Sequence, residues 1–196
     1  MKKCVDFYFD FGSPTTYLAW TQLPAITAAA GAELNYHPIL LGAIFQATGN
    51  RSPVAVPGKA VWMMKDIARF AARYRVPFSH NPHFPINTLP LMRGAIGYQM
   101  KKPELFNSYV ATIFKAIWVD GLNLGDQATL AQLLQASGFD ATEFLTIIQL
   151  PEVKEKLRTE TEAAVQRNVF GAPTFFVGDE MFFGQDRLDF VQEALR

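Results

Sequence analysis

The stretch from Phe7 to Trp20, FYFDFGSPTTYLAW, decides how the chain begins to fold. From Val5 to Phe9, apolar residues alternate with Asp or Tyr, which is the period-two pattern of a half-buried strand. Ser13 and Pro14 then follow a glycine. Serine is a good helix cap, and proline is tolerated at the first helical position, where its missing N–H would be unpaired. The stretch therefore predicts a strand, a tight turn and a helix, with Ser13 at the corner.

A second strand is predicted from Glu33 to Leu41 (ELNYHPILL), after a helical stripe that continues from Ser13 towards Gly31. Two strands that flank one helix form a βαβ unit, whose strands are parallel. The following segment, from Ala43 to Pro57, carries the turn residues GNRSP and is expected to be irregular. The N-terminal part of the chain therefore predicts a parallel strand pair followed by a loop.

The middle of the chain is predicted to be mostly helical, and the C-terminal part returns to strands. The predicted helices are Lys59–Tyr74, Leu91–Met100, Pro103–Val119, Asp126–Ala136, Thr142–Ile148 and Pro151–Asn168. Thr174–Val177 and Met181–Phe183 then predict a hairpin around a Gly-Asp-Glu turn. An amphipathic helix from Asp186 to Leu195 closes the chain.

This order of elements predicts the fold class. Without the middle helices, the elements run βαβ–α–ββα, which is the order of the thioredoxin fold. We therefore predict an α/β protein with a thioredoxin-like fold interrupted by an all-helical insertion. Residues 1–57 and 151–196 are expected to form the thioredoxin-like domain, and residues 58–150 the helical insertion domain.

The composition argues against several classes of function. The chain has 196 residues, 49% of them apolar, so it can bury a sizeable core. Its 18 basic and 18 acidic residues balance, which argues against a nucleic-acid or membrane-surface partner. Asp6 and Asp10 interrupt any signal-peptide core, and no apolar run approaches the ~20 residues of a membrane span. These features predict a cytoplasmic protein.

The cysteine and histidine content argues against redox and metal chemistry. Cys4 is the only cysteine, so the chain has no internal disulfide and dithiol exchange is excluded. The three histidines, His37, His80 and His83, lack the spacing of metal ligands, and no metal site is expected.

Three places carry candidate chemistry, and the first is the Ser13 corner. A helix N-terminus offers unpaired N–H groups and about half a positive charge, so it stabilises an anion. In thioredoxin-fold thiol oxidases this corner carries a Cys-x-x-Cys motif, whereas here Ser13 and Thr16 stand at the two cysteine positions. The alternative is that Ser13 only caps the helix.

The other two places lie near the C-terminus. Pro173 follows Gly171 and Ala172 at the entry to a strand, and in the thioredoxin fold this proline is cis and faces the helix of the nucleophile. The backbone N–H and C=O of Ala172 are then free to pair with an extended peptide. Asp186 begins the last predicted helix, where its carboxylate either caps the helix or receives an ammonium group.

Together these pieces resemble the 2-hydroxychromene-2-carboxylate isomerase family, which belongs to the kappa class of glutathione transferases, relatives of the DsbA-like thiol oxidases. The matching stretches are DFYFDFGSPTTYL, ATGNRSP and VFGAPTFFVGDEMFFGQDRL, and the resemblance runs over nearly the whole chain. Each motif alone is weak, but their combination at these distances is specific. The resemblance implies a thioredoxin-like homodimer that binds glutathione.

The resemblance also implies a role for each residue of the glutathione site. Ser13 resembles the family's catalytic serine, whose hydroxyl donates to the sulfur of glutathione, and Ala172, before Pro173, would pair with the cysteinyl backbone. The other positions that resemble glutathione contacts are Gln185 and Asp186 at the γ-glutamyl end, Asn50 as a lining residue and Lys59 near the glycyl carboxylate. A thiol supplied by the cofactor explains a serine where a thiol oxidase has a cysteine.

The family's reaction interconverts 2-hydroxychromene-2-carboxylate and trans-o-hydroxybenzylidenepyruvate in aromatic (naphthalene) catabolism. It implies reversible addition of a thiolate to a conjugated carbon, then bond rotation and elimination. This substrate is flat, aromatic and anionic, so it needs an apolar slot and a cation. The aromatic candidates are Trp118, Phe114, Tyr98 and Phe170, and the cations are Arg51 and Lys59. The alternative for each aromatic residue is a place in the core.

Three other functions stay open at this point. A kappa-like glutathione transferase would use the same thiolate but consume it in a conjugate. A non-catalytic binding protein on this fold would show no rise in melting temperature with glutathione, or no effect of Ser13→Ala on turnover. A redox function is the least favoured, because the cysteines are missing.

Overall fold

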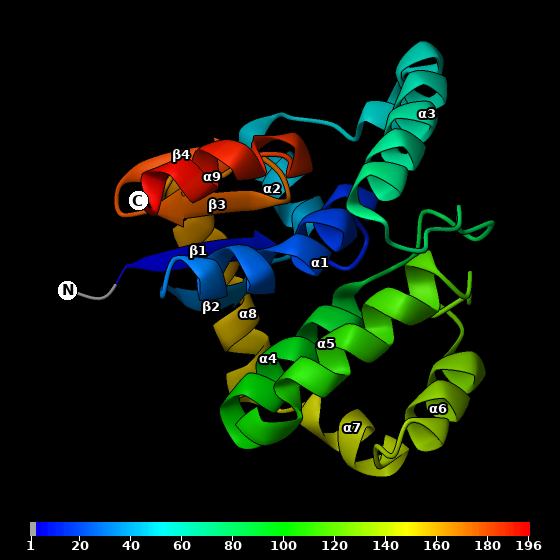
Figure 1. Cartoon of the computed structure of the whole chain (residues 1–196). Helices are drawn as coiled ribbons and strands as arrows, with labels where there is room; N and C mark the ends of the chain where they lie inside the picture. The colour runs from blue at the N-terminus through cyan, green and yellow to red at the C-terminus, as the bar shows by residue number, and fades with distance from the viewer. Residues whose placement is uncertain (1–2) are drawn as a thin grey trace.

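A mixed four-stranded sheet organises the structure, a computed structural model that describes residues 3–196. The strand order is β2-β1-β3-β4 (Figure 1). β1 (Cys4–Phe9) pairs in parallel with β2 (Glu33–Pro38), as predicted for the βαβ unit. β3 (Thr174–Val177) runs antiparallel to β1 and forms the predicted hairpin with β4 (Glu180–Phe183). The predicted α/β order of a thioredoxin-like fold is therefore confirmed.

Helices cover the sheet and form a block beside it. Their bounds are α1 (Pro14–Ala29), α2 (Leu41–Thr48), α3 (Pro57–Tyr74), α4 (Leu89–Lys101), α5 (Pro103–Trp118), α6 (Gln127–Ala136), α7 (Ala141–Ile147), α8 (Pro151–Gln166) and α9 (Leu188–Ala194). Helices α3 to α8 begin and end within two residues of their predicted bounds. In Figure 1, α4 to α7 lie together below the sheet, and α3 stands apart at the upper right. No helix within residues 3–196 is both long and apolar enough to cross a bilayer.

The segment from Ala43 to Pro57, predicted to be irregular, contains most of α2 and the short 3-10 helix η1 (Pro53–Ala55). Helix α2 begins where the Asp10 carboxylate accepts the N–H of Leu41 over 2.8 Å. It ends at Gly49, whose φ of 70° is the left-handed conformation that favours glycine. A contact with Asp10, the residue after β1, is therefore made at the start of this helix, and β2 ends at Pro38 rather than at Leu41.

The C-terminal helix also differs from its prediction. Gly184 has a φ of 98°, and the turn it makes is followed by the 3-10 helix η2 (Gln185–Arg187) before α9 begins. Asp186 lies inside η2, where its carboxylate contacts the Arg187 guanidinium over 2.8 Å. The prediction that Asp186 begins the last helix is therefore wrong, and its side chain caps neither η2 nor α9.

One apolar core joins the sheet to the helical block. The rings of Phe7 and Phe9 on β1 stack with centroids 5.5 Å apart, and Phe9 reaches Phe114 of α5 at 6.1 Å. Each aromatic side chain buries about 150–250 Å², so these rings contribute much of the packing energy. The helical block is thereby held against the strand whose end carries Ser13.

Candidate active site

The Ser13 corner joins the end of β1 to the start of α1. The Oγ atom of Ser13 accepts a hydrogen bond from the Thr16 N–H over 3.2 Å, and Pro14 is the first helical residue, so the predicted cap is confirmed. The Ser13 hydroxyl donates to the carbonyl oxygen of Ala172, 3.0 Å away. Ser13 is therefore both a helix cap and a direct link to the residue before Pro173.

The Ala172–Pro173 corner faces Ser13 from the start of β3. The peptide bond between the two residues is cis, as expected for the thioredoxin fold. A Cβ at position 171 would lie 2.8 Å from the ring of Phe183, so a larger residue there would displace that ring. The Gly184 N–H donates to the Pro173 carbonyl over 3.0 Å, which ties this corner to the end of the hairpin.

A groove of about 840 Å³ lies at these two corners. Its walls are the start of α1, α2 with the segment after it, α3, and η2. The predicted residues that line it are Ser13, Asn50, Arg51, Lys59, Phe170, Ala172, Gln185 and Asp186. Pro173, which follows Ala172, and Trp118 are not among the lining residues of this groove. The groove therefore collects most of the predicted site from segments that are far apart in sequence.

Asn50 connects the segment after α2 to the approach to β3. Its Nδ2 donates to the carbonyl oxygen of Phe170 over 2.9 Å, and its Oδ1 accepts the N–H of Arg51 over 2.8 Å. The ring of Phe170 packs against Phe183, with centroids 4.7 Å apart. Asn50 thus holds two lining residues of the groove in place through their backbones.

Tyr74 connects α3 to the C-terminal side of the groove. Its hydroxyl donates to the carbonyl oxygen of Gln185 over 2.6 Å. Burial and the nearby Asp189 carboxylate raise the pKa of Tyr74 to about 12, so the hydroxyl keeps its proton at neutral pH. Gln185 is buried, whereas Asp186 beside it is exposed at the groove's rim.

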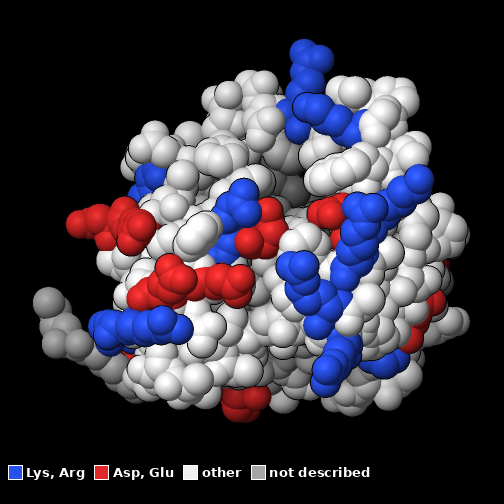
Figure 2. All heavy atoms as spheres, turned by 45° about the horizontal axis from the view of Figure 1, so that its top comes forward, with Lys and Arg blue, Asp and Glu red and all other residues white. Residues whose placement is uncertain are grey.

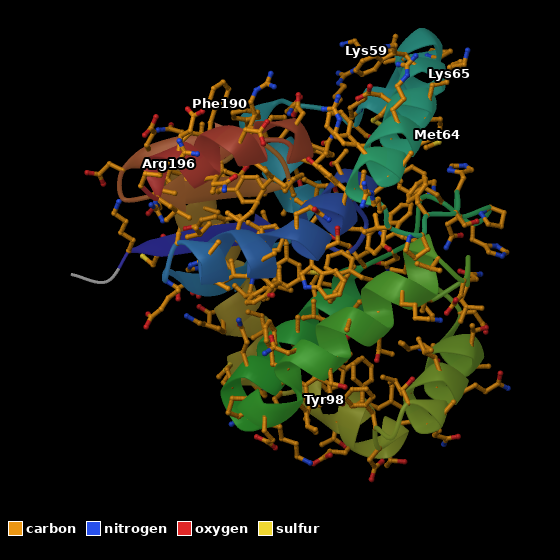
Figure 3. The ribbon with its side chains drawn as sticks, in the orientation of Figure 1. Lys59, Met64, Lys65, Tyr98, Phe190 and Arg196 are labelled. Carbon is orange, nitrogen blue, oxygen red and sulfur yellow. The ribbon has the colours of Figure 1, made fainter. Side chains whose placement is uncertain are left out.

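Charges of both signs line the groove. Figure 2 shows a hollow on one face of the molecule, bordered by basic and acidic side chains. Arg51 and Lys59 are exposed lining residues, and Lys59 lies on the outer part of α3 (Figure 3). Asp66 of α3 and Asp186 bring acidic groups to the same groove. This arrangement suits a ligand that carries both an ammonium group and carboxylates.

A second, apolar cavity of about 270 Å³, here called the chamber, adjoins the groove. Groove and chamber share Pro14, Met63, Phe84 and Pro85. The other residues that line the chamber are Val54, Ala60, Met64, His80 and Trp118. His80 is the one titratable side chain among these lining residues, so the chamber suits an apolar ring rather than a charge.

The aromatic candidates from the helical block divide between chamber and core. Trp118 lines the chamber, while its Nε1–H donates to the carbonyl oxygen of Phe11 over 2.8 Å. Phe114 and Tyr98 are buried in the core and line neither cavity, so they are corrected from candidate to packing residues. Figure 3 shows Tyr98 in the helical block, away from Met64 on α3. A helical stripe alone does not reveal which of its aromatic residues reaches a cavity.

Asp10 is a lining residue that the sequence prediction missed. Its carboxylate is 1% exposed and accepts the N–H groups of Gly12 and Leu41, each over 2.8 Å. Burial raises the pKa of Asp10, and hydrogen bonds from Gly12, Leu41 and Thr88 oppose part of that rise. The first residue of α2 and the residues just before α1 and α4 therefore meet around one carboxylate. A carboxylate between a buried strand and a glycine turn is the signal that could have pointed to it.

A helix start that faces a cis-proline strand is the geometry of the DsbA-like thioredoxin domain, whose family model matches residues 4–196. The chain belongs to this family. Over 197 residues it is 34% identical to the 2-hydroxychromene-2-carboxylate isomerase of Sphingobium xenophagum, covering 100% of this chain and 99% of the relative. It is 27% identical to glutathione S-transferase kappa 1 of Caenorhabditis elegans, covering 98% of this chain and 90% of the relative.

A solved structure of a DsbA-like relative shares the whole architecture. The structure of selenomethionine 2-hydroxychromene-2-carboxylate isomerase matches with a TM-score of 0.86 and 31% identity, covering 98% of this chain and 94% of that one. The expected resemblance to this isomerase family and to the kappa-class transferases is therefore confirmed. The relatives that match nearly the whole chain carry two named activities.

Proposed function

We propose that this chain is a glutathione-dependent isomerase that interconverts 2-hydroxychromene-2-carboxylate and trans-o-hydroxybenzylidenepyruvate. The observation that carries the proposal is the Ser13 hydroxyl at the start of α1, opposite the cis bond of Ala172 and Pro173, in a groove whose lining residues include no cysteine. The full-length relatives named 2-hydroxychromene-2-carboxylate isomerase support this reaction over dithiol exchange.

The groove fits glutathione in size, charge and backbone chemistry. Its volume falls within the roughly 300–1,000 Å³ of ordinary small-molecule sites. Glutathione carries one ammonium group and two carboxylates; Asp186 would match the ammonium group and Lys59 the glycyl carboxylate. The residues proposed to hold it are Ser13, Asn50, Lys59, Ala172, Pro173, Gln185 and Asp186, with Ala172 binding the peptide backbone and Pro173 shaping that corner.

The Ser13 corner is proposed to hold the sulfur as a thiolate. When bound, glutathione supplies a nucleophilic thiol that can add to a conjugated carbon and leave again. A thiol with a pKa near 8.5 is only about 3% ionised at pH 7, and lowering that pKa by two units needs about 2.7 kcal/mol. One charge-assisted hydrogen bond contributes about 1.5–3 kcal/mol and a helix N-terminus about 0.3–1 kcal/mol. Ser13 at the start of α1 offers both.

The chamber is proposed to take the aromatic ring of the substrate. It adjoins the sulfur position, because Pro14 lines both cavities directly after Ser13. Trp118 offers a flat apolar wall, and Phe170 lines the adjoining groove. Arg51 would then pair with the substrate carboxylate from the groove side, since the chamber itself holds no Lys or Arg among its lining residues.

A kappa-like glutathione transferase is the second candidate, and the relatives of that name, 27% identical over nearly the whole chain, support it. Both activities would share the glutathione half of the site. They differ in product: an isomerase returns glutathione unchanged, whereas a transferase forms a stable conjugate. Chromatography of the products, with glutathione counted before and after turnover, separates the two.

The test of the proposal is a direct isomerisation assay with the purified chain. Interconversion of the two isomers is followed by absorbance, with and without glutathione. We expect turnover only with glutathione, and no loss of glutathione during it. Turnover that does not respond to glutathione, or no turnover with it, overturns the proposal.

The cellular setting and assembly belong to the same proposal. A glutathione-dependent reaction suits the reducing cytoplasm, where thiols stay reduced. A homodimer is proposed from the resemblance to the family, and light scattering of the purified chain measures it. A monomer in that measurement would remove the dimer from the proposal without affecting the reaction.

A further inference from the structure

The Ser13 hydroxyl has three partners but only one proton. Its Oγ accepts the Thr16 N–H over 3.2 Å, its proton goes to the Ala172 carbonyl oxygen over 3.0 Å, and the Thr15 Oγ1 lies 3.0 Å away. A carbonyl oxygen only accepts, and a hydroxyl donates once. With the Ser13 proton committed to Ala172, the proton between the two hydroxyls belongs to Thr15. Thr15 therefore donates to Ser13, and Ser13 donates to Ala172.

The two hydroxyls differ in how readily each can donate to another group. If Ser13 turned away, it would break the hydrogen bond that joins α1 to the buried Ala172 carbonyl. If Thr15 turned away, Ser13 would still accept from Thr16 and donate to Ala172. Thr15 is also half-buried rather than buried, and it lines the groove beside Ser13. Turning the Thr15 hydroxyl towards another group therefore costs fewer hydrogen bonds at this corner than turning the Ser13 hydroxyl.

We propose that Thr15 is a second catalytic residue, whose hydroxyl turns from Ser13 to donate a hydrogen bond to the thiolate of the bound cofactor. Ser13 donates to the Ala172 carbonyl until a peptide N–H of the bound cofactor takes that carbonyl over. The Ser13 hydroxyl is then free to donate to the sulfur as well. The thiol proton leaves to solvent and no covalent bond forms in this step. The proposal rests on the proposed glutathione site, and it adds a residue that the resemblance does not assign.

The test is the pKa of the bound glutathione thiol, followed through the ultraviolet absorbance of the thiolate as pH is raised. In the unchanged chain we expect a pKa well below the ordinary value near 8.5. In Thr15→Val we expect it to rise by about one unit, a tenfold smaller ionisation constant, because one charge-assisted hydrogen bond is lost. Thr15→Ser keeps a hydroxyl and is expected to restore the low pKa.

Two further variants separate the hydroxyl's effect from a general loss of structure. Thr27→Val makes the same substitution farther along α1, where the Thr27 hydroxyl donates to the Leu23 carbonyl, and it is expected to leave the thiol pKa unchanged. The double variant Ser13→Ala with Thr15→Val is expected to raise the thiol pKa more than either single change. If Thr15→Val folds poorly, Thr15→Ala takes its place.

The outcomes distinguish this inference from the function on which it rests. A thiol pKa in Thr15→Val equal to that of the unchanged chain overturns the role of Thr15 and leaves the glutathione site intact. No depression of the thiol pKa in the unchanged chain overturns the proposed function itself. A rise in pKa that Thr15→Ser fails to reverse also overturns the inference, because the hydroxyl is then not the cause.

Discussion

The two walls of the groove are built in different ways. The wall at the sheet end is buried and tied by hydrogen bonds: Ser13 is 5% exposed and Ala172 is 8% exposed, with a hydroxyl–carbonyl bond between them. The opposite wall is the first half of α3, where the lining residue Lys59 is exposed and the lining residue Trp62 is 60% exposed. In Figure 1 this helix projects from the body of the molecule, whereas α1 lies beside the sheet.

The two walls suit two different tasks, holding a thiolate and binding a flat substrate. A thiolate needs donors at fixed positions, and the sheet-end wall provides one because the Ser13 hydroxyl is held by the Thr16 N–H and the Ala172 carbonyl. A flat substrate needs apolar area of suitable shape, and α3 provides it through side chains such as Met63 and Met64. The outer half of α3 is largely exposed, so we expect a substitution there to leave the sulfur position undisturbed. The two walls should therefore respond differently to substitution.

Removing the Ser13 hydroxyl is expected to give the largest effect. Ser13→Ala removes a helix cap worth about 1 kcal/mol and the hydrogen bond to the Ala172 carbonyl, worth about 0.5–1.5 kcal/mol. In the proposed complex it also removes a charge-assisted bond of about 1.5–3 kcal/mol. We expect kcat/KM to fall at least tenfold, while the melting temperature drops by about 3–10 °C. Steady-state kinetics and thermal unfolding of the same preparation measure both. An unchanged kcat/KM would mean that Ser13 is only a cap.

Filling the chamber is expected to affect the substrate alone. Ala60 is a half-buried lining residue of the chamber, and Ala60→Phe would occupy much of its roughly 270 Å³. We expect KM for the aromatic substrate to rise about tenfold, on the order of the binding energy of one buried ring. The affinity for glutathione, measured by calorimetry, should stay the same. Val61→Phe is the matched control, because Val61 is exposed and lines neither cavity.

If Ala60→Phe weakened glutathione as much as the substrate, the two walls would not be independent. If it changed neither, the ring would bind elsewhere, and Trp118 would be only a packing residue. Either result would redirect the search for the substrate site to the groove itself.

Removing the hydrogen bond from Tyr74 of α3 to the Gln185 carbonyl is expected to weaken glutathione binding moderately. Tyr74→Phe removes the hydroxyl that donates to the Gln185 carbonyl, and an unpaired buried carbonyl costs about 1–3 kcal/mol. We expect lower stability and a glutathione affinity weakened about threefold to tenfold, because Gln185 is no longer held. Since the pKa of Tyr74 is about 12, this hydroxyl keeps its proton between pH 6 and 9, so the loss of affinity should be independent of pH in that range.

Tyr109→Phe is the control for this substitution. The Tyr109 hydroxyl donates to the Leu91 carbonyl over 2.8 Å inside the helical block, away from both walls. It should lower stability by a similar amount and leave glutathione binding unchanged. Equal effects of the two variants on glutathione would show that general loosening, and not the loss of the hydrogen bond to Gln185, is responsible.

The sequence predicts the two walls unequally, for a physical reason. The sheet-end wall depends on backbone geometry, which only a few residue types satisfy, so Ser13 after a glycine and Pro173 before a strand are visible as motifs. The helical wall depends on apolar area, which many residues supply, so Met63 and Ala60 leave no pattern. Trp118 was a candidate among several aromatics, and only the packing of α5 decides that it lines the chamber.

The two remaining wrong predictions have a tertiary contact and a turn as their causes. Helix α2 was not predicted because its first N–H is held by Asp10, a carboxylate that directly follows β1 and lies far from α2 in sequence. The start of the last helix was misplaced because Gly184 makes a turn before η2, so Asp186 does not act as a cap. In both cases the prediction used residue preferences along the chain, which do not include a tertiary contact or the exact turn. The predicted division at residues 57 and 151 stays a prediction, since one core spans both parts.

The smallest expected effect is a gain in stability within the sheet-end wall. Thr16 is fully buried in α1, and its Oγ1 makes no hydrogen bond within residues 3–196. A buried hydroxyl without a partner costs free energy, so Thr16→Val should raise the free energy of unfolding by roughly 0.5–1 kcal/mol, as denaturant titration measures. Thr161→Val is the opposite control, because the Thr161 hydroxyl accepts from Leu40 and donates to Leu157. A loss of stability in Thr16→Val would show that water satisfies this hydroxyl, and that the hydrogen-bonded wall extends one residue deeper into α1 than its protein contacts indicate.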